Sequence, residues 1–249
     1  MTSPITAAKQ QLRALLKKRL SNVPHDSILA QSHTIFESLK NFKPYQEASR
    51  ISIFLSMPAG EIQTDAIVRH ALDEGKQVFV PYLHRSPLQT PNTPVRVMDM
   101  VHLKSIQDYD GLKRDAWGIP SIDPVTVHER QRIFGGPDVH RSDLATLDLI
   151  LMPGVAFDVD ETGAIRRLGH GKGFYDFFLN RYLATDVKTG DGHPLRFYGL
   201  ALREQWLDAA AGEEVPMGTY DRKIHGVIMG DGEIKESPDP RSINAWHPC

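Results

Sequence analysis

Short apolar runs that stop at proline or glycine recur along this chain and predict the strands of a buried sheet. The run Leu149–Met152 is followed at once by Pro153-Gly154, and a run from Gln77 ends at Pro81 in the same way. Similar runs lie at residues 50–57, 96–102, 196–202 and 224–229. We therefore expect strands in these segments, several of them delivering a loop to an edge of the sheet.

Helical periodicity fills the gaps between several of these runs. Residues Pro4–Leu20 gather leucines on one side of a helix and basic residues on the other. Further helices are expected at residues 25–39 and 65–73, and from about Lys172, where aromatic residues follow at roughly helical spacing. Strands and helices that alternate over 249 residues favour one three-layer α/β/α domain, residues 1–249, with a mostly parallel, open, Rossmann-like sheet.

Polar stretches with glycine and proline interrupt this pattern. Residues 125–147 and 184–194 have the composition of loop insertions, and residues after Gly230 have that of a polar tail.

Composition narrows the classes of partner. The net charge is −2, with no basic block, which argues against nucleic acid or an anionic membrane as a partner. No apolar stretch reaches membrane-spanning length. The one cysteine, Cys249, excludes an intramolecular disulfide and suggests a reducing compartment. We expect a cytoplasmic monomer that acts on small molecules, while a basic, acid-poor N-terminus leaves a mitochondrial pool open.

A glycine loop stands between the strand at 149–152 and the aromatic helix. It alternates glycine with polar residues behind two arginines: Arg166, Arg167, Gly169, His170, Gly171, Lys172 and Gly173. Alternate glycines let backbone amides approach a ligand, and amides that lead into a helix attract anions. With the flanking cations, the loop indicates a polyphosphate site. The spacing matches neither the dinucleotide fingerprint nor the Walker loop, and an ordinary turn is the alternative.

Asp176 directly follows this loop and suggests a metal. A carboxylate beside bound phosphates is tolerated when a divalent cation lies between them. The alternative is an acid that interacts with the helix dipole.

The same residues carry a family resemblance. Pro153-Gly-Val-Ala-Phe-Asp158 followed by Arg167-Leu-Gly-x-Gly-x-Gly-aromatic-Tyr-Asp176 resembles the 5-formyltetrahydrofolate cyclo-ligase family, also called methenyltetrahydrofolate synthetase. Two departures are visible: His170 stands where the family commonly has Arg, and Phe174 where it commonly has Tyr. The resemblance implies ATP- and Mg²⁺-dependent cyclisation of 5-formyltetrahydrofolate to 5,10-methenyltetrahydrofolate, through a phosphorylated imidate.

The resemblance also implies which residues bind ATP. They are two cations of the first helix and the glycine loop: Lys9, Arg13, Arg167, Leu168, Gly169, His170, Gly171, Lys172, Gly173, Phe174 and Tyr175. Three of them would act in catalysis: Arg167, Lys172 and Tyr175. Lys9 and Arg13 lie four residues apart and hence on one helical face, with a merely solvated face as the alternative.

The folate would contact Leu55, Glu61, Trp117 and Tyr175 by the same resemblance. A helix-start acid is the alternative for Glu61, and a core or lid plug is the alternative for Trp117. Asp221, in a Val215-Pro216-x-x-x-x-Asp motif, would share Mg²⁺ with Asp176. Without the metal these two acids would repel each other, so we expect their replacement to change stability little.

Two other classes stay open. A different ATP-dependent ligase or a sugar-phosphate enzyme on the same fold would keep the glycine loop without needing Glu61 or Trp117. A nucleotide sensor would bind ATP without turnover, although the presence of both Asp176 and Asp221 argues against it.

Overall fold

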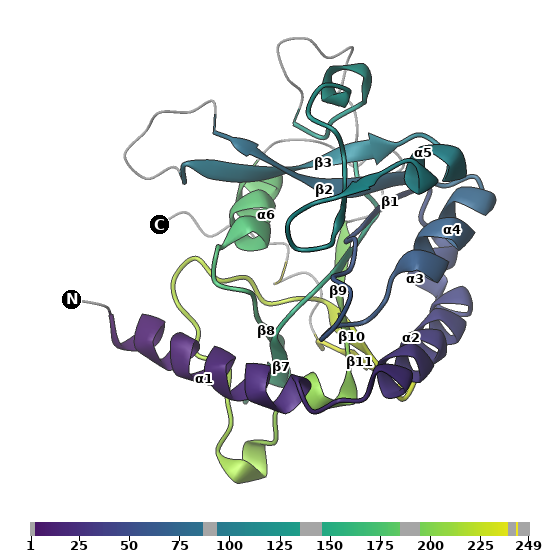
Figure 1. The fold of residues 1–249 in the computed structure, drawn as a ribbon. Coiled ribbons are helices and arrows are strands. Elements are labelled where there is room, and N and C mark those ends of the chain that lie inside the picture. Colours follow the sequence, from purple (N-terminus) through teal and green to yellow (C-terminus); the bar gives the residue numbers. More distant parts are fainter. Residues whose placement is uncertain (1–2, 87–93, 135–145, 185–194, 239–242, 244–249) are drawn as a thin grey trace.

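A seven-stranded sheet organises the chain, in the order β11-β10-β9-β6-β1-β2-β3 (Figure 1). The computed structural model describes residues 3–86, 94–134, 146–184, 195–238 and 243. The five central strands from β10 to β2 run parallel, while the edge strands β3 and β11 run antiparallel to their neighbours. Their bounds are β1 Arg50–Ile53, β2 Gln77–Arg85, β3 Arg96–Leu103, β6 Leu149–Met152, β9 Arg196–Ala201, β10 Gly226–Met229 and β11 Ile234–Glu236.

Both faces of the sheet are covered, because successive strand residues point to opposite sides. Leu149 and Leu151 of β6 join a core with α2 (His25–Lys40) and α4 (Asp65–Asp73). Ile150 and Met152 join a second core with α6 (Phe174–Ala184). Figure 1 shows α2 and α4 on one side of the sheet and α6 on the other. The prediction of a three-layer α/β fold with a mostly parallel sheet is confirmed.

The remaining elements are short, apart from the N-terminal helix. They are α1 Pro4–Leu20, α3 Lys43–Glu47, α5 Ile106–Asp110, β4 Lys113–Arg114, β5 Pro120–Ser121, β7 Ala156–Val159, β8 Ile165–Leu168, and 3-10 turns η1 Val127–Glu129, η3 Arg203–Gln205 and η4 Ala209–Ala211.

Several expected bounds differ from the structure. The strand expected at residues 50–57 ends at Ile53, and the chain then runs as a loop to α4. The aromatic helix begins at Phe174, two residues after Lys172. The segment after Gly230 is not a free tail, because Ile234–Glu236 pairs with β10 as edge strand β11. An edge strand with one solvated face can be polar, which is why its composition resembled a tail.

A hairpin of β7 and β8 is the main element that the sequence did not predict. Asp160 closes its turn by accepting the backbone amides of Thr162 and Ala164, and Gly163 takes a φ of +81°. The ring of Phe157 fills the space left by the missing side chains of Gly154 and Gly199. The Asp-x-x-Gly turn followed by Ile165 was the available signal.

The predicted insertions are only partly described. In the first, Ile133 is buried and its amide donates to the Met100 carbonyl at 3.0 Å, so residues 125–134 pack on the edge strand β3. Residues 135–145 and 185–194, which hold most of both insertions, lie outside the described residues. Within the described part of the chain, no helix is long and apolar enough to cross a membrane.

Candidate active site

The glycine loop joins β8 to α6 beside the carboxyl end of β6. The side chain of Arg167, on β8, donates from Nη1 to the carbonyl of Pro153, the residue that follows β6, at 3.1 Å. Gly171 and Gly173 have φ values of +96° and +67°, which L side chains rarely adopt. Gly171 and Gly173 are therefore required by the backbone path of this loop.

Helix α1 lies against the loop through its basic face. Arg13 Nε donates to the Gly169 carbonyl at 2.8 Å, and its guanidinium lies so close to Gly171 that a Cβ there would be 3.2 Å from Cζ. Leu16 anchors the helix in a small core with Val155 and Leu168, whereas Leu15 is exposed. Lys9 lies one turn before Arg13 and pairs with Asp221. The structure thus brings Arg13 to the glycine loop and Lys9 to Asp221, so neither side chain lies on a fully solvated face.

Asp176 and Asp221 lie on adjoining segments although 45 residues separate them in the sequence. Asp176 Oδ1 accepts the backbone amide of Arg222, the residue after Asp221, at 3.1 Å. Its Oδ2 accepts from Arg167 Nη2 at 3.0 Å, and Asp221 Oδ2 accepts the Gly218 amide at 2.5 Å as well as pairing with Lys9. The expectation that these acids repel each other in the empty site is corrected by the structure, because each carboxylate has a cationic partner.

These two carboxylates fit Mg²⁺, provided that a phosphate completes the site. Mg²⁺ takes hard oxygen ligands and often uses one or two carboxylates together with water and substrate phosphate. Among the described residues there is no group of three or more His, Cys, Asp or Glu side chains that could hold a metal. Asp176 and Asp221 could thus hold the metal together with a nucleotide.

Glu61 lies in the loop between β1 and α4 and is almost completely buried, with 5% of its surface exposed. Its Oε1 accepts the Met57 amide at 2.6 Å. Burial raises the pKa of Glu61 to about 7, although the Met57 hydrogen bond lowers it in part. Its Oε2 lies 3.9 Å from Nε2 of His170, at the tip of the glycine loop. This contact joins the expected folate and nucleotide sites.

Tyr175 connects the same two regions from the start of α6. It packs against both cores, and the Arg167 guanidinium lies over its ring at 5.5 Å from the centroid. Its hydroxyl is buried and has no hydrogen-bond partner within the described part of the structure. Burial raises the pKa of Tyr175, so the hydroxyl remains protonated and free to donate. A buried unpaired hydroxyl is costly and suggests a ligand partner.

The remaining predicted folate residues differ in exposure. Leu55 is buried in the core shared with α2 and α4. Trp117 is 75% exposed and is therefore not a core plug. The neighbouring Gly118 packs on Pro58, where an added Cβ would lie 2.7 Å from Cγ, so the Trp117 turn borders the loop that carries Glu61.

The structure corrects part of the role expected for the other loop residues. The side chain of Leu168 is buried in the core, which leaves only its backbone for a nucleotide. Phe174, the first residue of α6, packs against the second core, while Lys172 is exposed. The contacts that position Arg167 could not be predicted, since Pro153 and Asp176 carry no sign of this pairing in the sequence.

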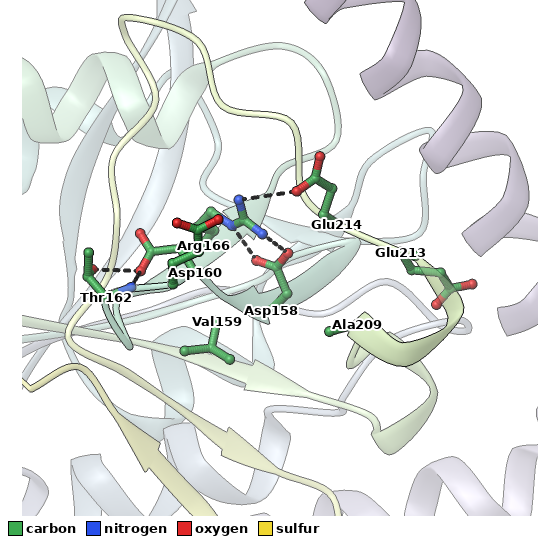
Figure 2. A pocket seen from close by; sticks show the side chains of 10 residues that line it. Asp158, Val159, Asp160, Thr162, Arg166, Ala209, Glu213 and Glu214 are labelled. Atoms are coloured by element: carbon green, nitrogen blue, oxygen red, sulfur yellow. Dashed lines mark hydrogen bonds and ion pairs between the residues drawn. The ribbon is translucent and has the colours of Figure 1, made fainter.

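Arg166 does not face this site. Adjacent residues of a strand point to opposite sides, and Arg166 binds both carboxylate oxygens of Asp158, at 2.8 and 2.5 Å. Figure 2 shows it between Asp158 and Glu214, on the wall of a cavity of about 470 Å³. Half of the ten residues that line the cavity are acidic: Asp158, Asp160, Glu161, Glu213 and Glu214. This lining is unsuited to phosphate, so Arg167 is the arginine of the pair that serves the loop.

Comparison with known proteins first defines the class of fold. A solved structure of a 5,10-methenyltetrahydrofolate synthetase from Aquifex aeolicus superimposes with a TM-score of 0.59 over 96% of this chain and 97% of that chain, at 22% identity. It is an α/β protein of the same architecture.

The sequence comparisons then identify the family. The family model of the 5-formyltetrahydrofolate cyclo-ligase family matches residues 5–230. A probable 5-formyltetrahydrofolate cyclo-ligase of Caenorhabditis elegans is 33% identical over 93% of this chain and 96% of its own length. The 5-formyltetrahydrofolate cyclo-ligase of Saccharomyces cerevisiae is 31% identical over 92% and 98%. The chain belongs to the 5-formyltetrahydrofolate cyclo-ligase family, as its motifs predicted.

Proposed function

We propose that this protein uses ATP to cyclise 5-formyltetrahydrofolate to 5,10-methenyltetrahydrofolate. Family membership and the names of the relatives support the folate substrate. One observation carries the proposal: two groups of residues meet in one site. The cations, the glycine loop and the metal-binding acids suit a nucleotide, and the buried carboxyl group of Glu61 and the buried hydroxyl of Tyr175 suit a folate. His170 joins the two halves through its 3.9 Å contact with Glu61.

The proposed reaction has two steps. The formyl oxygen attacks the terminal phosphorus of ATP, the bond from that phosphorus to the bridging oxygen breaks, and ADP leaves. The folate nitrogen that does not carry the formyl group then attacks the formyl carbon of the phosphorylated imidate. The carbon–oxygen bond breaks, the oxygen leaves within inorganic phosphate, and the proton of that nitrogen passes to phosphate or solvent.

The nucleotide half of the site would position the terminal phosphate. Phosphoryl transfer requires mainly alignment and charge neutralisation, and the side chains of Lys9, Arg13, Arg167 and Lys172 together with the loop amides supply both. Asp176 and Asp221 would hold Mg²⁺, which when bound neutralises charge on the phosphates. ATP would release Lys9 from Asp221 and Arg167 from Asp176, so each cation transfers from a carboxylate to a phosphate.

The folate half would orient the formyl group. Glu61 is fixed by the Met57 amide through one oxygen and keeps its other oxygen for a ligand donor or for His170. The Tyr175 hydroxyl is a buried donor without a partner among the described residues, and it is close enough to Glu61 to sense its charge. The exposed ring of Trp117 offers a flat apolar surface to the pterin or the aminobenzoyl group. Burial of the ring system would also exclude water from the reacting phosphate.

The test is to mix the protein with 5-formyltetrahydrofolate and Mg-ATP and to follow the absorbance of methenyltetrahydrofolate and the release of ADP. We expect one ADP for each methenyl product, and neither product when tetrahydrofolate replaces the formyl compound. ADP without methenyltetrahydrofolate would favour another ATP-dependent enzyme. Nucleotide binding without either product would favour a sensor.

Assembly and location rest on the sequence alone. We propose a monomer in the cytoplasm, for which light scattering of the purified protein and localisation of the tagged full chain are the direct measurements.

A further inference from the structure

His170 of the glycine loop faces a buried acid, Glu61. Its Nε2 lies 3.9 Å from Glu61 Oε2. The Glu61 side chain is 7% exposed, while that of His170 is 49% exposed. The other Glu61 oxygen is committed to the Met57 amide. The charge of the imidazole can therefore influence the second carboxylate oxygen of Glu61, Oε2.

We propose that His170 is a positioning residue that sets the ionisation of Glu61, and thereby the pH range in which the folate site accepts its substrate. The second part of this inference rests on the proposed function, while the first part does not.

The charges around the pair make it responsive to pH. Burial lowers the pKa of His170, and the positive charges of Arg167 on β8 and Arg13 on α1, which face it, lower this pKa further. Tyr175 of α6 faces Glu61 and remains uncharged at neutral pH. Burial raises the pKa of Glu61 to about 7. Across the 3.9 Å contact, a protonated His170 would favour an ionised Glu61, whereas a neutral imidazole would not.

A permanent charge at position 170 would remove this response. His170→Arg places a fixed cation beside Glu61, whereas His170→Asn keeps a polar side chain that cannot become charged. The arginine variant should ionise Glu61 at lower pH than the native protein, and the asparagine variant at higher pH. One pH unit corresponds to about tenfold in the proton equilibrium.

The first measurement is a ¹³C titration of the glutamate carboxyl groups, with Glu61→Gln to assign the signal. We expect the Glu61 midpoint to fall by about one pH unit in His170→Arg relative to His170→Asn. Coincident midpoints in the native protein and His170→Asn would overturn the inference, whatever the arginine variant does. Because no folate is present, this outcome is independent of the proposed function.

The second measurement is calorimetry of 5-formyltetrahydrofolate binding between pH 5.5 and 8.5, roughly one to two units on either side of the Glu61 midpoint. We expect the pH midpoint of affinity to follow the carboxyl midpoint in each variant, with about a tenfold difference in affinity between them at about pH 6. Binding with the same pH profile in all variants would overturn the role in the folate site. An absence of folate binding at every pH, with shifted carboxyl midpoints, would instead refute the proposed function.

Discussion

Lys9→Met is expected to weaken ATP binding and to strengthen the binding of a free divalent cation. In the structure Lys9 neutralises Asp221, and in the proposed complex it contacts a phosphate. Methionine keeps the length and the apolar stem of the side chain but removes the charge. The two opposite changes would separate a residue with this double role from a merely structural one.

The burial of the ion pair sets the expected magnitude. The side chains of Lys9 and Asp221 are 16% and 21% exposed, so solvent screens them only in part. A hydrogen bond to a charged group contributes about 1.5 to 3 kcal/mol, which corresponds to a loss of roughly 10- to 100-fold in ATP affinity. Releasing Asp221 from a partly exposed pair worth about 1 kcal/mol should strengthen cation binding about fivefold.

The assay measures both ligands without turnover. ATP binding is followed by calorimetry in the presence of a chelator, and Mn²⁺, a probe for a carboxylate site, is followed by the paramagnetic signal of the free ion. Lys17→Met is the matched control, because Lys17 lies on the same helix and is exposed. If Lys9→Met weakens both ligands, or neither, the reciprocal role of Lys9 is refuted.

Three further predictions concern the acids and the buried hydroxyl. Asp176→Asn and Asp221→Asn should each lower turnover at least about tenfold, roughly 1.4 kcal/mol, with partial rescue at high Mg²⁺. Asp176→Asn should also lower the melting temperature, since it leaves the buried Arg167 guanidinium without a charged partner. In the folded protein the pKa of Glu61 is about 7, above its ordinary value of 4.5, so folded Glu61 holds its proton more tightly than the unfolded chain does. Burial of Glu61 therefore costs stability as pH rises from 4.5 to 7. In denaturant titrations, the stability gain of Glu61→Gln should grow over this window by up to about 3 kcal/mol. Tyr175→Phe should leave the melting temperature unchanged or slightly higher, because the hydroxyl has no partner among the described residues, yet lower turnover by about tenfold; a stability loss with unchanged turnover would contradict its role in the site.

The local sequence predicted the elements that carry the site better than the contacts within it. The strand at 149–152, the glycine loop and the basic face of the first helix were all expected, because each depends on spacing within one segment. The pairing of Lys9 with Asp221 joins residues 212 positions apart, and nothing in either segment specifies its partner. The sequence thus suggested repelling acids where the fold pairs each acid with a cation.

Two further features became visible only in the fold. Arg166 and Arg167 look equivalent in the sequence, but strand β8 turns them to opposite sides, and only the fold shows that Asp158 neutralises Arg166. The β7–β8 hairpin was missed because charged residues interrupt both of its four-residue strands, Asp158 in β7 and Arg166-Arg167 in β8. Strands this short are stabilised by tertiary packing, here of Phe157 against Gly154 and Gly199.

The central claim, that the site activates the formyl oxygen by phosphorylation, is tested most directly by isotope transfer. The substrate would be 5-formyltetrahydrofolate with ¹⁸O in its formyl group, turned over with Mg-ATP in unlabelled water, and the inorganic phosphate would be analysed by mass spectrometry. We expect one ¹⁸O atom in each phosphate released with methenyltetrahydrofolate. Unlabelled phosphate, with the ¹⁸O recovered in water, would contradict it.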